Sequence, residues 1–332
     1  MKTETKLTRW GIIGCGGIAQ RMAAVLAALP DASLEAVAAR DGERAGAFAA
    51  RFGAARAYGE YASLIADDGI DAVYIATVNT THFDIARACI EAGKAVLCEK
   101  PLTMTAAEAE ELFALASARG VLLMEALWSR FLPAWKEARR LLRDGAIGTV
   151  RGASIDNAFF LPFDPESRLY SREKGGGILL DSGVYCVHLA LYLFGDDCTC
   201  RGVSGRLAPT GVDRYAAMLL DWPGGETASL SCGCDRAGRC AAVVYGEDGQ
   251  LELPRFVAAD RVLLRQTGAE ERAIECEPVD GFVYEAREFQ RLFAAGETVC
   301  PDCSPEDTAT SMRLLDAAMR EIERVERIPR VC

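Results

Sequence analysis

The sequence has few histidines: only His82 and His188 occur among its 332 residues. So small a number argues against a metal centre built from several histidine ligands, and we expect no bound metal. A catalytic acid or base is therefore expected among the tyrosine, lysine, aspartate and glutamate side chains.

Basic residues and long apolar runs are also scarce. Lys and Arg number 37 against 48 Asp and Glu, which makes a formal net charge of −11. Because an acidic surface repels phosphate groups, we expect neither a nucleic acid nor a membrane surface as a partner. We find no run of about 20 apolar residues, and residues 1–9 carry charges of both signs, unlike a signal peptide. These features predict a cytoplasmic protein without a membrane span.

The thirteen cysteines are odd in number and scattered through apolar stretches, which favours reduced thiols over a disulfide framework. Cys300 and Cys303 form a lone C-x-x-C pair. Without a second such pair or histidines at ligand spacing, we interpret this pair as structural and not as a zinc site.

The length predicts two domains, since one domain has roughly 100–200 residues. Up to Glu125, short apolar runs alternate with amphipathic segments, the pattern of βαβ units in a doubly wound parallel sheet. We therefore predict one domain at residues 1–125 and a second at residues 126–332. Strands of the first are expected at residues 10–13, 34–39, 56–58, 72–76, 95–98 and 121–124, and helices at 41–51, 81–92 and 105–119.

Beyond Glu125 the pattern changes. We expect a helix at residues 131–143, a strand at 149–160, a charged loop at 161–174 and a second helix at 179–194. Five strand-length stretches follow between turn signals, and residues 304–326 show the amphipathic pattern of a packing helix. The expected class is α/β: a parallel sheet followed by an α+β domain with a mostly antiparallel sheet.

A glycine-rich motif, Gly14-Cys-Gly-Gly-Ile-Ala19, directly follows the first predicted strand and opens a helix. In this G-x-G-x-x-A pattern Gly14 permits a tight turn, Gly16 leaves room for a pyrophosphate, and Ala19 lets the helix pack on the strand. The N-terminus of the helix would hold the phosphates. We predict dinucleotide binding at Gly14, Gly16, Gly17, Ile18 and Ala19; the alternative is a glycine-rich turn without a ligand.

The end of the second predicted strand carries Ala38, Ala39 and Arg40, where an NAD-specific site would place an acid. The Arg40 guanidinium suits a 2′-phosphate, which favours NADP over the alternative cofactor NAD. Asp41 is better explained as a helix N-cap. The alternative for Arg40 is a solvated arginine before a helix.

Two further segments carry candidate chemistry. Glu99-Lys100-Pro101 lies just past the carboxyl end of a buried strand, where ligands bind in an open parallel sheet. A glycine run, residues 175–177, precedes Asp181, Tyr185 and His188, which occupy positions i, i+4 and i+7 of one predicted helix face. Polar groups on an otherwise apolar face are costly unless they are paired or line a cleft.

These motifs together resemble the Gfo/Idh/MocA oxidoreductase family over essentially the whole chain. Residues 124–133 (MEALWSRFLP) and 180–185 (LDSGVY) resemble its branch of dimeric dihydrodiol dehydrogenases, to which NADP-dependent D-xylose dehydrogenases are similar. The resemblance implies an NAD(P)-binding Rossmann domain, then a substrate-binding and oligomerisation domain with a large open antiparallel sheet. It also implies a homodimer, or a dimer of dimers, formed through that sheet.

The resemblance assigns three catalytic residues by matching positions. Lys100 matches the catalytic lysine of the family, and Asp181 matches the acid that binds substrate or orients this lysine. Tyr185 stands where many relatives have histidine, as in the dihydrodiol dehydrogenase branch, in which the tyrosine is the acid/base. A free phenol titrates near ~10, so this role requires a nearby positive charge, supplied by Lys100 and the nicotinamide. The alternatives are core packing for Tyr185, a helix-start role for Asp181 and a surface position for Lys100.

The resemblance also extends the cofactor site. His82 matches a histidine that helps line the cofactor cleft, although Val78 replaces the proline that many relatives have four residues before it. We add Thr77 and Glu99 to the predicted cofactor-binding residues, together with Lys100.

The expected reaction is hydride transfer between nicotinamide and a carbinol carbon of a small polyhydroxylated substrate: a sugar, a cyclic polyol or a trans-dihydrodiol. Trp128 and Arg168 are candidate substrate contacts, and His188 is either a further contact or a buried core histidine. The alternative function is a non-catalytic NAD(P)-binding sensor, because the family includes a regulatory protein. Lys100, Asp181 and Tyr185 favour the enzyme, since a sensor needs no proton donor at a hydride site.

Overall fold

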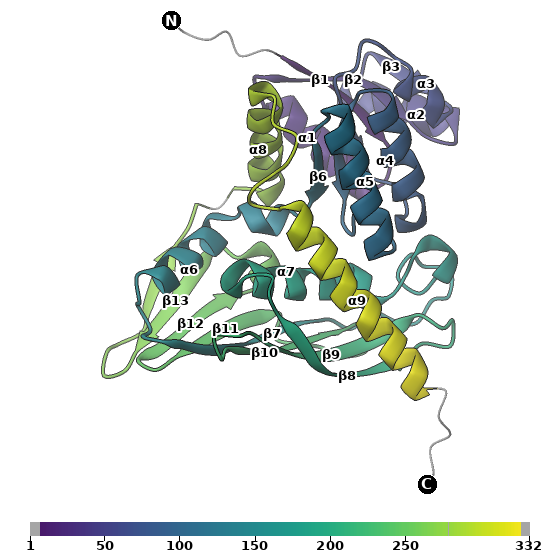
Figure 1. Ribbon diagram of the computed structural model, residues 1–332. Helices are drawn as coiled ribbons and strands as arrows, with labels where there is room; N and C mark the ends of the chain where they lie inside the picture. The colour runs from purple at the N-terminus through teal and green to yellow at the C-terminus, as the bar shows by residue number, and fades with distance from the viewer. Residues whose placement is uncertain (1–6, 278, 327–332) are drawn as a thin grey trace, which may run out of the picture. The chain divides into compact units, whose positions relative to one another are not determined.

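A computed structural model describes residues 7–277 and 279–326 of the chain (Figure 1). The chain divides into two compact units. The first consists of Met1–Trp128 and Asp280–Pro305, and the second of Ser129–Val279 and Glu306–Cys332. The predicted boundary after residue 125 lies close to Trp128. The prediction placed all of residues 126–332 in the second domain, whereas the chain returns to the first unit at Asp280.

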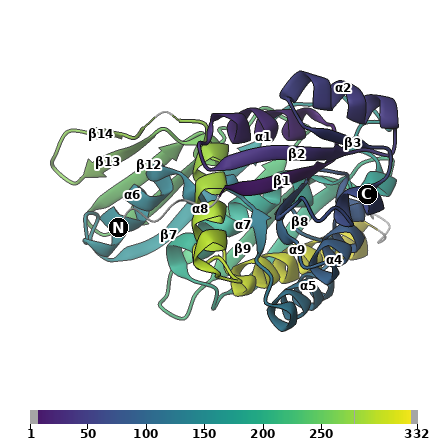
Figure 2. The same ribbon diagram turned by 90° about the horizontal axis from the view of Figure 1, so that it is seen from above.

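The first unit is built on a six-stranded sheet in the order β3-β2-β1-β4-β5-β6, with all strands parallel. Figure 2 shows two of its strands, β1 and β2, side by side. The order of the strands reverses between β1 and β4, and doubly wound sheets bind ligands at the carboxyl ends of the strands at such a point. All six predicted strands are present: β1 (Thr8–Ile13), β2 (Ala32–Ala38), β3 (Arg56–Tyr58), β4 (Ala72–Ile75), β5 (Ala95–Glu99) and β6 (Leu123–Ala126).

Helices cover both faces of this sheet, which is why its strands form nearly continuous apolar runs. The predicted start and stop signals are confirmed: Asp41 caps one helix, and Thr105 with Glu108 forms a capping box on another. Gly53 and Gly120 end these helices in the left-handed conformation. The helices are α1 (Gly17–Ala28), α2 (Gly42–Phe52), α3 (Tyr61–Ile65), α4 (His82–Glu91), α5 (Ala106–Arg119) and α8 (Gly281–Ala295).

Helix α8 was not predicted, and it explains why the chain returns to the first unit. Its Phe289 ring lies 4.8 Å from the ring of Trp10 on β1, measured between centroids. At its start, Asp280 accepts two hydrogen bonds from Arg21 of α1, at 2.6 and 2.8 Å. An apolar helix face needs a partner surface, and here that surface is the sheet about 270 residues earlier in the chain.

The second unit is built on an eight-stranded sheet in the order β14-β13-β12-β11-β7-β10-β9-β8. Every neighbouring pair is antiparallel except β7 and β10, so the predicted, mostly antiparallel sheet is confirmed. The strands are β7 (Val150–Ala158), β8 (Thr199–Leu207), β9 (Asp213–Asp221), β10 (Thr227–Gly233), β11 (Ala241–Gly246), β12 (Gly249–Pro254), β13 (Arg261–Gln266) and β14 (Arg272–Glu275). The two strands that were not predicted, β8 and β14, are the edge strands, whose residues are mostly exposed and lack an apolar alternation.

Three helices lie over one face of the second sheet: α6 (Pro133–Arg143), α7 (Val184–Phe194) and α9 (Pro305–Glu326) (Figure 1). Helix α7 packs on β7 and β10, and α6 packs on β12 and β13. The predicted apolar side of α9 is buried: Met312, Leu314, Leu315, Ala318 and Ile322.

One helical stretch, Arg172–Phe194, is long and apolar enough to span a membrane by those criteria alone. It includes α7, and 78% of its most apolar window is buried inside the protein. The core helix of a globular protein has these same properties, so the stretch is weak evidence for a span. The absence of a membrane span stays a prediction.

The twelve cysteines among the described residues are all free thiols, as expected from their number and spacing. Burial raises the pKa of Cys89 to about 12 and that of Cys300 to about 12. Buried thiols of this kind are poor nucleophiles and poor metal ligands, because both roles use the thiolate.

Candidate active site

The predicted nucleotide turn joins β1 to α1 at the carboxyl edge of the first sheet. Gly14 has a φ of 109° and donates from its N–H to the carbonyl of Ala38 at 2.9 Å. A methyl group on Gly14 would overlap the backbone oxygen of Ala76, which follows β4. The turn therefore requires glycine at this position.

Gly16 and Gly17 have the opposite surroundings. A methyl group on either would meet no atom within 4 Å, and Gly16 caps α1 without a side-chain hydrogen bond. The backbone N–H groups of the first turn of α1 therefore face an open cradle, which fits a phosphate. Ala19 is fully buried and Ile18 is 44% exposed, so this turn has one packed side and one open side.

Arg40 is exposed just past the end of β2, and Ala38 and Ala39 before it are buried. Asp41 accepts hydrogen bonds from the N–H groups of Glu43 and Arg44, which confirms its predicted role as a helix cap. A guanidinium at this position suits a 2′-phosphate, and its contact with a cofactor stays a prediction.

His82 is fully buried at the start of α4, beyond Thr77 and the short helix η1 (Asn79–Thr81). Its Nδ1 lies 2.9 Å from the oxygen of Pro101, and its Nε2 lies 3.4 Å from the oxygen of Thr77. Burial lowers the pKa of His82, which favours the neutral ring with one proton. The shorter contact places that proton on Nδ1. His82 therefore binds backbone, and its predicted contact with the cofactor stays a prediction.

Lys100 lies half-buried directly after β5, and Glu99 before it is buried. The Tyr74 hydroxyl on the neighbouring strand β4 donates to Glu99 through a short hydrogen bond. Glu285 of α8 is 0% exposed, and burial, followed by the charge of Glu99, raises its pKa well above the ordinary value. Glu99 thus faces a buried hydroxyl and a buried acid on the α8 side of the sheet.

Trp128 ends the first unit and is packed against Phe282 of α8, with 5.7 Å between ring centroids. The Arg21 guanidinium lies over both rings, 5.1 Å from Trp128 and 4.2 Å from Phe282. The sequence pointed to Trp128 alone, because Arg21 and Phe282 lie on segments far apart in the chain. Contact of Trp128 with a substrate stays a prediction.

In the second unit the glycine run leads into five residues of π-helix, η4 (Leu179–Gly183), which continue as α7. Gly177 has a φ of 123°, and a methyl group on it would overlap Oδ1 of Asp213 on β9. Oδ2 of Asp213 accepts the N–H of Leu179 at 2.7 Å, and burial raises the pKa of Asp213 to about 6. Asp213 therefore holds the start of η4, the segment that contains Asp181. The sequence did not point to Asp213.

Asp181 lies in the π-helical segment and Tyr185 in the first turn of α7. The predicted spacing of i and i+4 assumed one continuous α-helix, whereas a π-turn widens the helix and often marks a functional site. The Asp181 side chain is 15% exposed and pairs with Arg168 at 2.7 Å. Arg168, predicted as a substrate contact, is thus a partner of the candidate acid.

His188 is fully buried, and its Nδ1 accepts a hydrogen bond from Nε of Arg130 at 3.2 Å. Arg130, also buried, forms a salt bridge with Asp307 at 2.9 Å. This supports the second of the two interpretations of His188, a buried core histidine.

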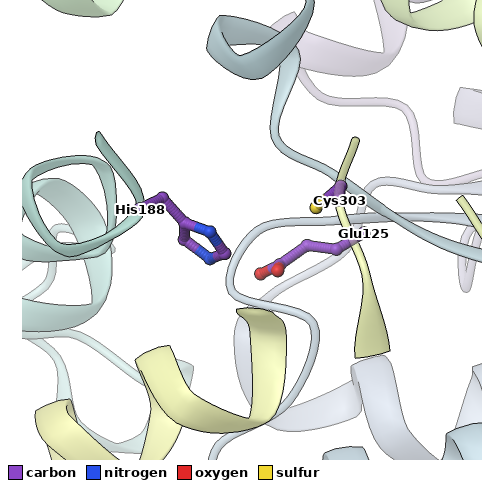
Figure 3. Close-up of side chains that lie close together, drawn as sticks. All are labelled: Glu125, His188 and Cys303. Carbon is purple, nitrogen blue, oxygen red and sulfur yellow. The ribbon is translucent and has the colours of Figure 1, made fainter. Parts of the chain in front are cut away.

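Glu125 is a site residue that the sequence reasoning missed. It is buried on β6 and accepts the N–H of Leu102 at 3.0 Å, two residues after Lys100. Figure 3 shows its side chain beside Cys303, and the carboxylate and the sulfur lie within 4.8 Å of each other. His188, drawn in the same view, belongs to the second unit. The available signal was an acid inside the apolar run of residues 121–128.

Comparisons with known proteins identify the relatives of this chain. The model of an oxidoreductase family with an NAD-binding Rossmann fold matches residues 8–127, and that of the Gfo/Idh/MocA C-terminal domain matches residues 135–252. The trans-1,2-dihydrobenzene-1,2-diol dehydrogenase of Mus musculus is 39% identical over 259 residues, which cover 77% of this chain and 77% of the mouse enzyme. That of Xenopus laevis is 34% identical over 330 residues, covering 95% of this chain and 98% of its own. A solved 3-ketoreductase from Actinomadura kijaniata, in complex with NADP and TDP-benzene, has a TM-score of 0.88 at 30% identity, covering 95% of this chain and 98% of its own.

Proposed function

Because the chain belongs to the Gfo/Idh/MocA oxidoreductase family, we propose that it is an NADP-dependent enzyme acting on a carbinol carbon of a sugar, cyclic polyol or trans-dihydrodiol. One observation carries the proposal. The open cradle at Gly16 and Gly17 and the half-buried Lys100 follow strands β1 and β5 of the same parallel sheet, at its carboxyl edge. That edge is where such sheets bind nucleotides and perform chemistry.

The cofactor, when bound, supplies or accepts the hydride. The first turn of α1 would hold its phosphates, and Arg40 would donate to the 2′-phosphate of NADP. Support for NADP over NAD comes from Arg40 in the place of an acid, and from the NADP bound to the 3-ketoreductase.

Tyr185 takes the hydroxyl proton when the substrate is oxidised and returns it when the product is reduced. The Lys100 ammonium assists by favouring the phenolate form of Tyr185 and by donating a hydrogen bond to the substrate oxygen. Asp181 binds a second hydroxyl, and the substrate takes the place of Arg168, with which the carboxylate is paired. Relatives named for a dihydrodiol and for a ketone support a substrate that reacts at a carbinol or carbonyl carbon.

We also propose that two copies pair through the face of the second sheet that the three helices leave uncovered in the described part of the chain. Small and polar side chains, together with Leu219, which is 44% exposed, line a shallow hollow on this face. They include Ser154, Ser204, Ala217, Ser229 and Ser231. A molar mass of one chain in light scattering at micromolar concentration would contradict this pairing.

The test of the enzyme proposal follows the absorbance of reduced nicotinamide while the purified protein is mixed with NADP and a panel of aldoses, inositols and trans-dihydrodiols. We expect turnover on at least one substrate, and a loss of about 100-fold or more in kcat for Tyr185→Phe and for Lys100→Met. Cofactor affinity, measured by fluorescence titration, is the control and should stay within a few-fold in the Tyr185 variant. Tight NADP binding without turnover on any substrate would instead support the sensor.

A further inference from the structure

The backbone directly after Lys100 is held by two buried side chains from separate elements. His82 of α4 donates from Nδ1 to the oxygen of Pro101, at 2.9 Å. Glu125 of β6 accepts the N–H of Leu102 at Oε1, at 3.0 Å. Consecutive residues of an irregular segment are therefore fixed at two points, close to the residue that carries the candidate ammonium.

The sheet places Glu125 for this contact. Strands β5 and β6 pair so that Glu125 lies opposite Cys98, and Leu123 of β6 packs in the same core as Cys98 and Leu102. Because side chains alternate along a strand, Glu125 points to the same face as Leu123. Glu125 is 1% exposed, so its hydrogen bond to Leu102 has little competition from water.

We propose that Glu125 is a positioning residue for Lys100, acting through the N–H of Leu102. The proposal rests on the proposed catalytic role of Lys100. A lysine ammonium sits on a flexible four-carbon stem, so its reach is set by where its Cα is held. An error of about 1 Å in such a position can cost up to about 100-fold in rate.

A buried acceptor is needed at this point because the N–H of Leu102 is itself buried. Without Glu125 the segment would either keep an unpaired donor or move it toward another acceptor. Movement would displace Lys100, whereas the nucleotide cradle on β1 and α1 would stay in place. The signature of a positioning role is thus a lower kcat with an unchanged cofactor affinity.

The chain offers a matched control a few residues further on. Glu108 accepts the N–H groups of Met104 and Thr105, at 3.0 and 3.2 Å, in the capping box of α5. Glu108→Ala removes a side-chain acceptor of two backbone N–H groups in the same connection, but at a partly buried position eight residues after Lys100. It therefore measures the effect of loosening the segment in general.

The experiment compares Glu125→Ala, Glu125→Gln and Glu108→Ala on the best substrate of the panel, with unfolding midpoints measured in parallel. We expect Glu125→Ala to lower kcat about 10- to 100-fold while the affinity for NADP changes less than threefold. Glu125→Gln keeps an oxygen acceptor and should recover most of the rate. If Glu125→Ala does not fold, Glu125→Asp is used, because it keeps the carboxylate and shortens its reach by one methylene.

A double-mutant cycle makes the test specific. In the Lys100→Met background, Glu125→Ala should cause no further loss of residual rate. A wild-type enzyme that needs Lys100 but is as active with Glu125→Ala as with Glu108→Ala would overturn the positioning role and leave the proposed function standing. Full activity of Lys100→Met would overturn the proposed function itself.

Discussion

In each unit the candidate residues follow a glycine with positive φ, Gly14 in the first unit and Gly177 in the second. The atoms that face these two glycines differ. At Gly14 the neighbour is the backbone oxygen of Ala76, and at Gly177 it is the side-chain oxygen of Asp213. A backbone oxygen beside a sheet is fixed, whereas a carboxylate sits on rotatable bonds and can gain a proton. The first turn is therefore set by backbone geometry alone, and the second depends on one ionisable side chain.

The largest effect is expected for Gly14→Ala. A left-handed φ costs a side chain about 1–3 kcal/mol, and overlap with a fixed oxygen adds to that cost. We expect the free energy of unfolding to fall by about 3 kcal/mol or more, with loss of NADP binding, measured by denaturant titration and by cofactor fluorescence. Gly16→Ala is the control: its methyl group meets no protein atom, so stability should stay near wild type while NADP binding weakens. Equal stability of the two variants would contradict this account.

A smaller loss is expected for Gly177→Ala. The same backbone strain applies, at about 1–3 kcal/mol, but the Asp213 carboxylate can rotate away at the expense of its bond to Leu179. The start of η4 should then shift, so kcat should fall more than NADP affinity. Denaturant titration and steady-state kinetics measure both effects. A stability loss as large as that of Gly14→Ala would mean that Asp213 is as rigid as backbone.

The most specific effect, and the one that depends on pH, concerns Asp213→Asn. Burial raises the pKa of Asp213 to about 6, above its ordinary value of 3.8. Between these values the folded state binds more protons than the unfolded state, so ionisation destabilises the fold as the pH rises from about 4 to 6. At ~1.36 kcal/mol per pH unit, this amounts to at most about 3 kcal/mol. The asparagine variant cannot ionise, so its stability relative to wild type should improve over that pH range. A difference that does not vary with pH would contradict the buried-carboxylate explanation.

Much of the fold was predictable from local pattern. The six strands of the first sheet, the capping box at Thr105 and the apolar side of α9 follow from periodicity and from capping residues that act within a few positions. Helix α8 also has such signals, an Asp280 cap and a terminal Gly296. The unit to which it belongs could not be predicted, because an apolar face does not specify its partner. Edge strands β8 and β14 lacked a signal because they bury little.

The candidate site divides in the same way. The sequence alone showed the motif from Gly14 to Ala19, an arginine at position 40 in place of an acid, and Lys100 at the end of a strand. It did not show the roles of Glu125 and Asp213 or the partner of Asp181. An acidic side chain inside an apolar strand has no evident role in the sequence. Its role becomes clear only when the structure shows which backbone N–H group it accepts from.

By itself the sequence determined which residues form turns, which cap helices and which place apolar side chains on one face. These features depend on the φ angle of a residue, on nearby hydrogen-bond donors and on the period of a helix or strand. Only the tertiary structure decided which buried acid meets which backbone N–H. Glu125 and Leu102 are 23 residues apart, and Asp213 and Leu179 are 34 apart. Such pairs form when packed strands bring distant segments within 3 Å, and no local preference encodes that distance.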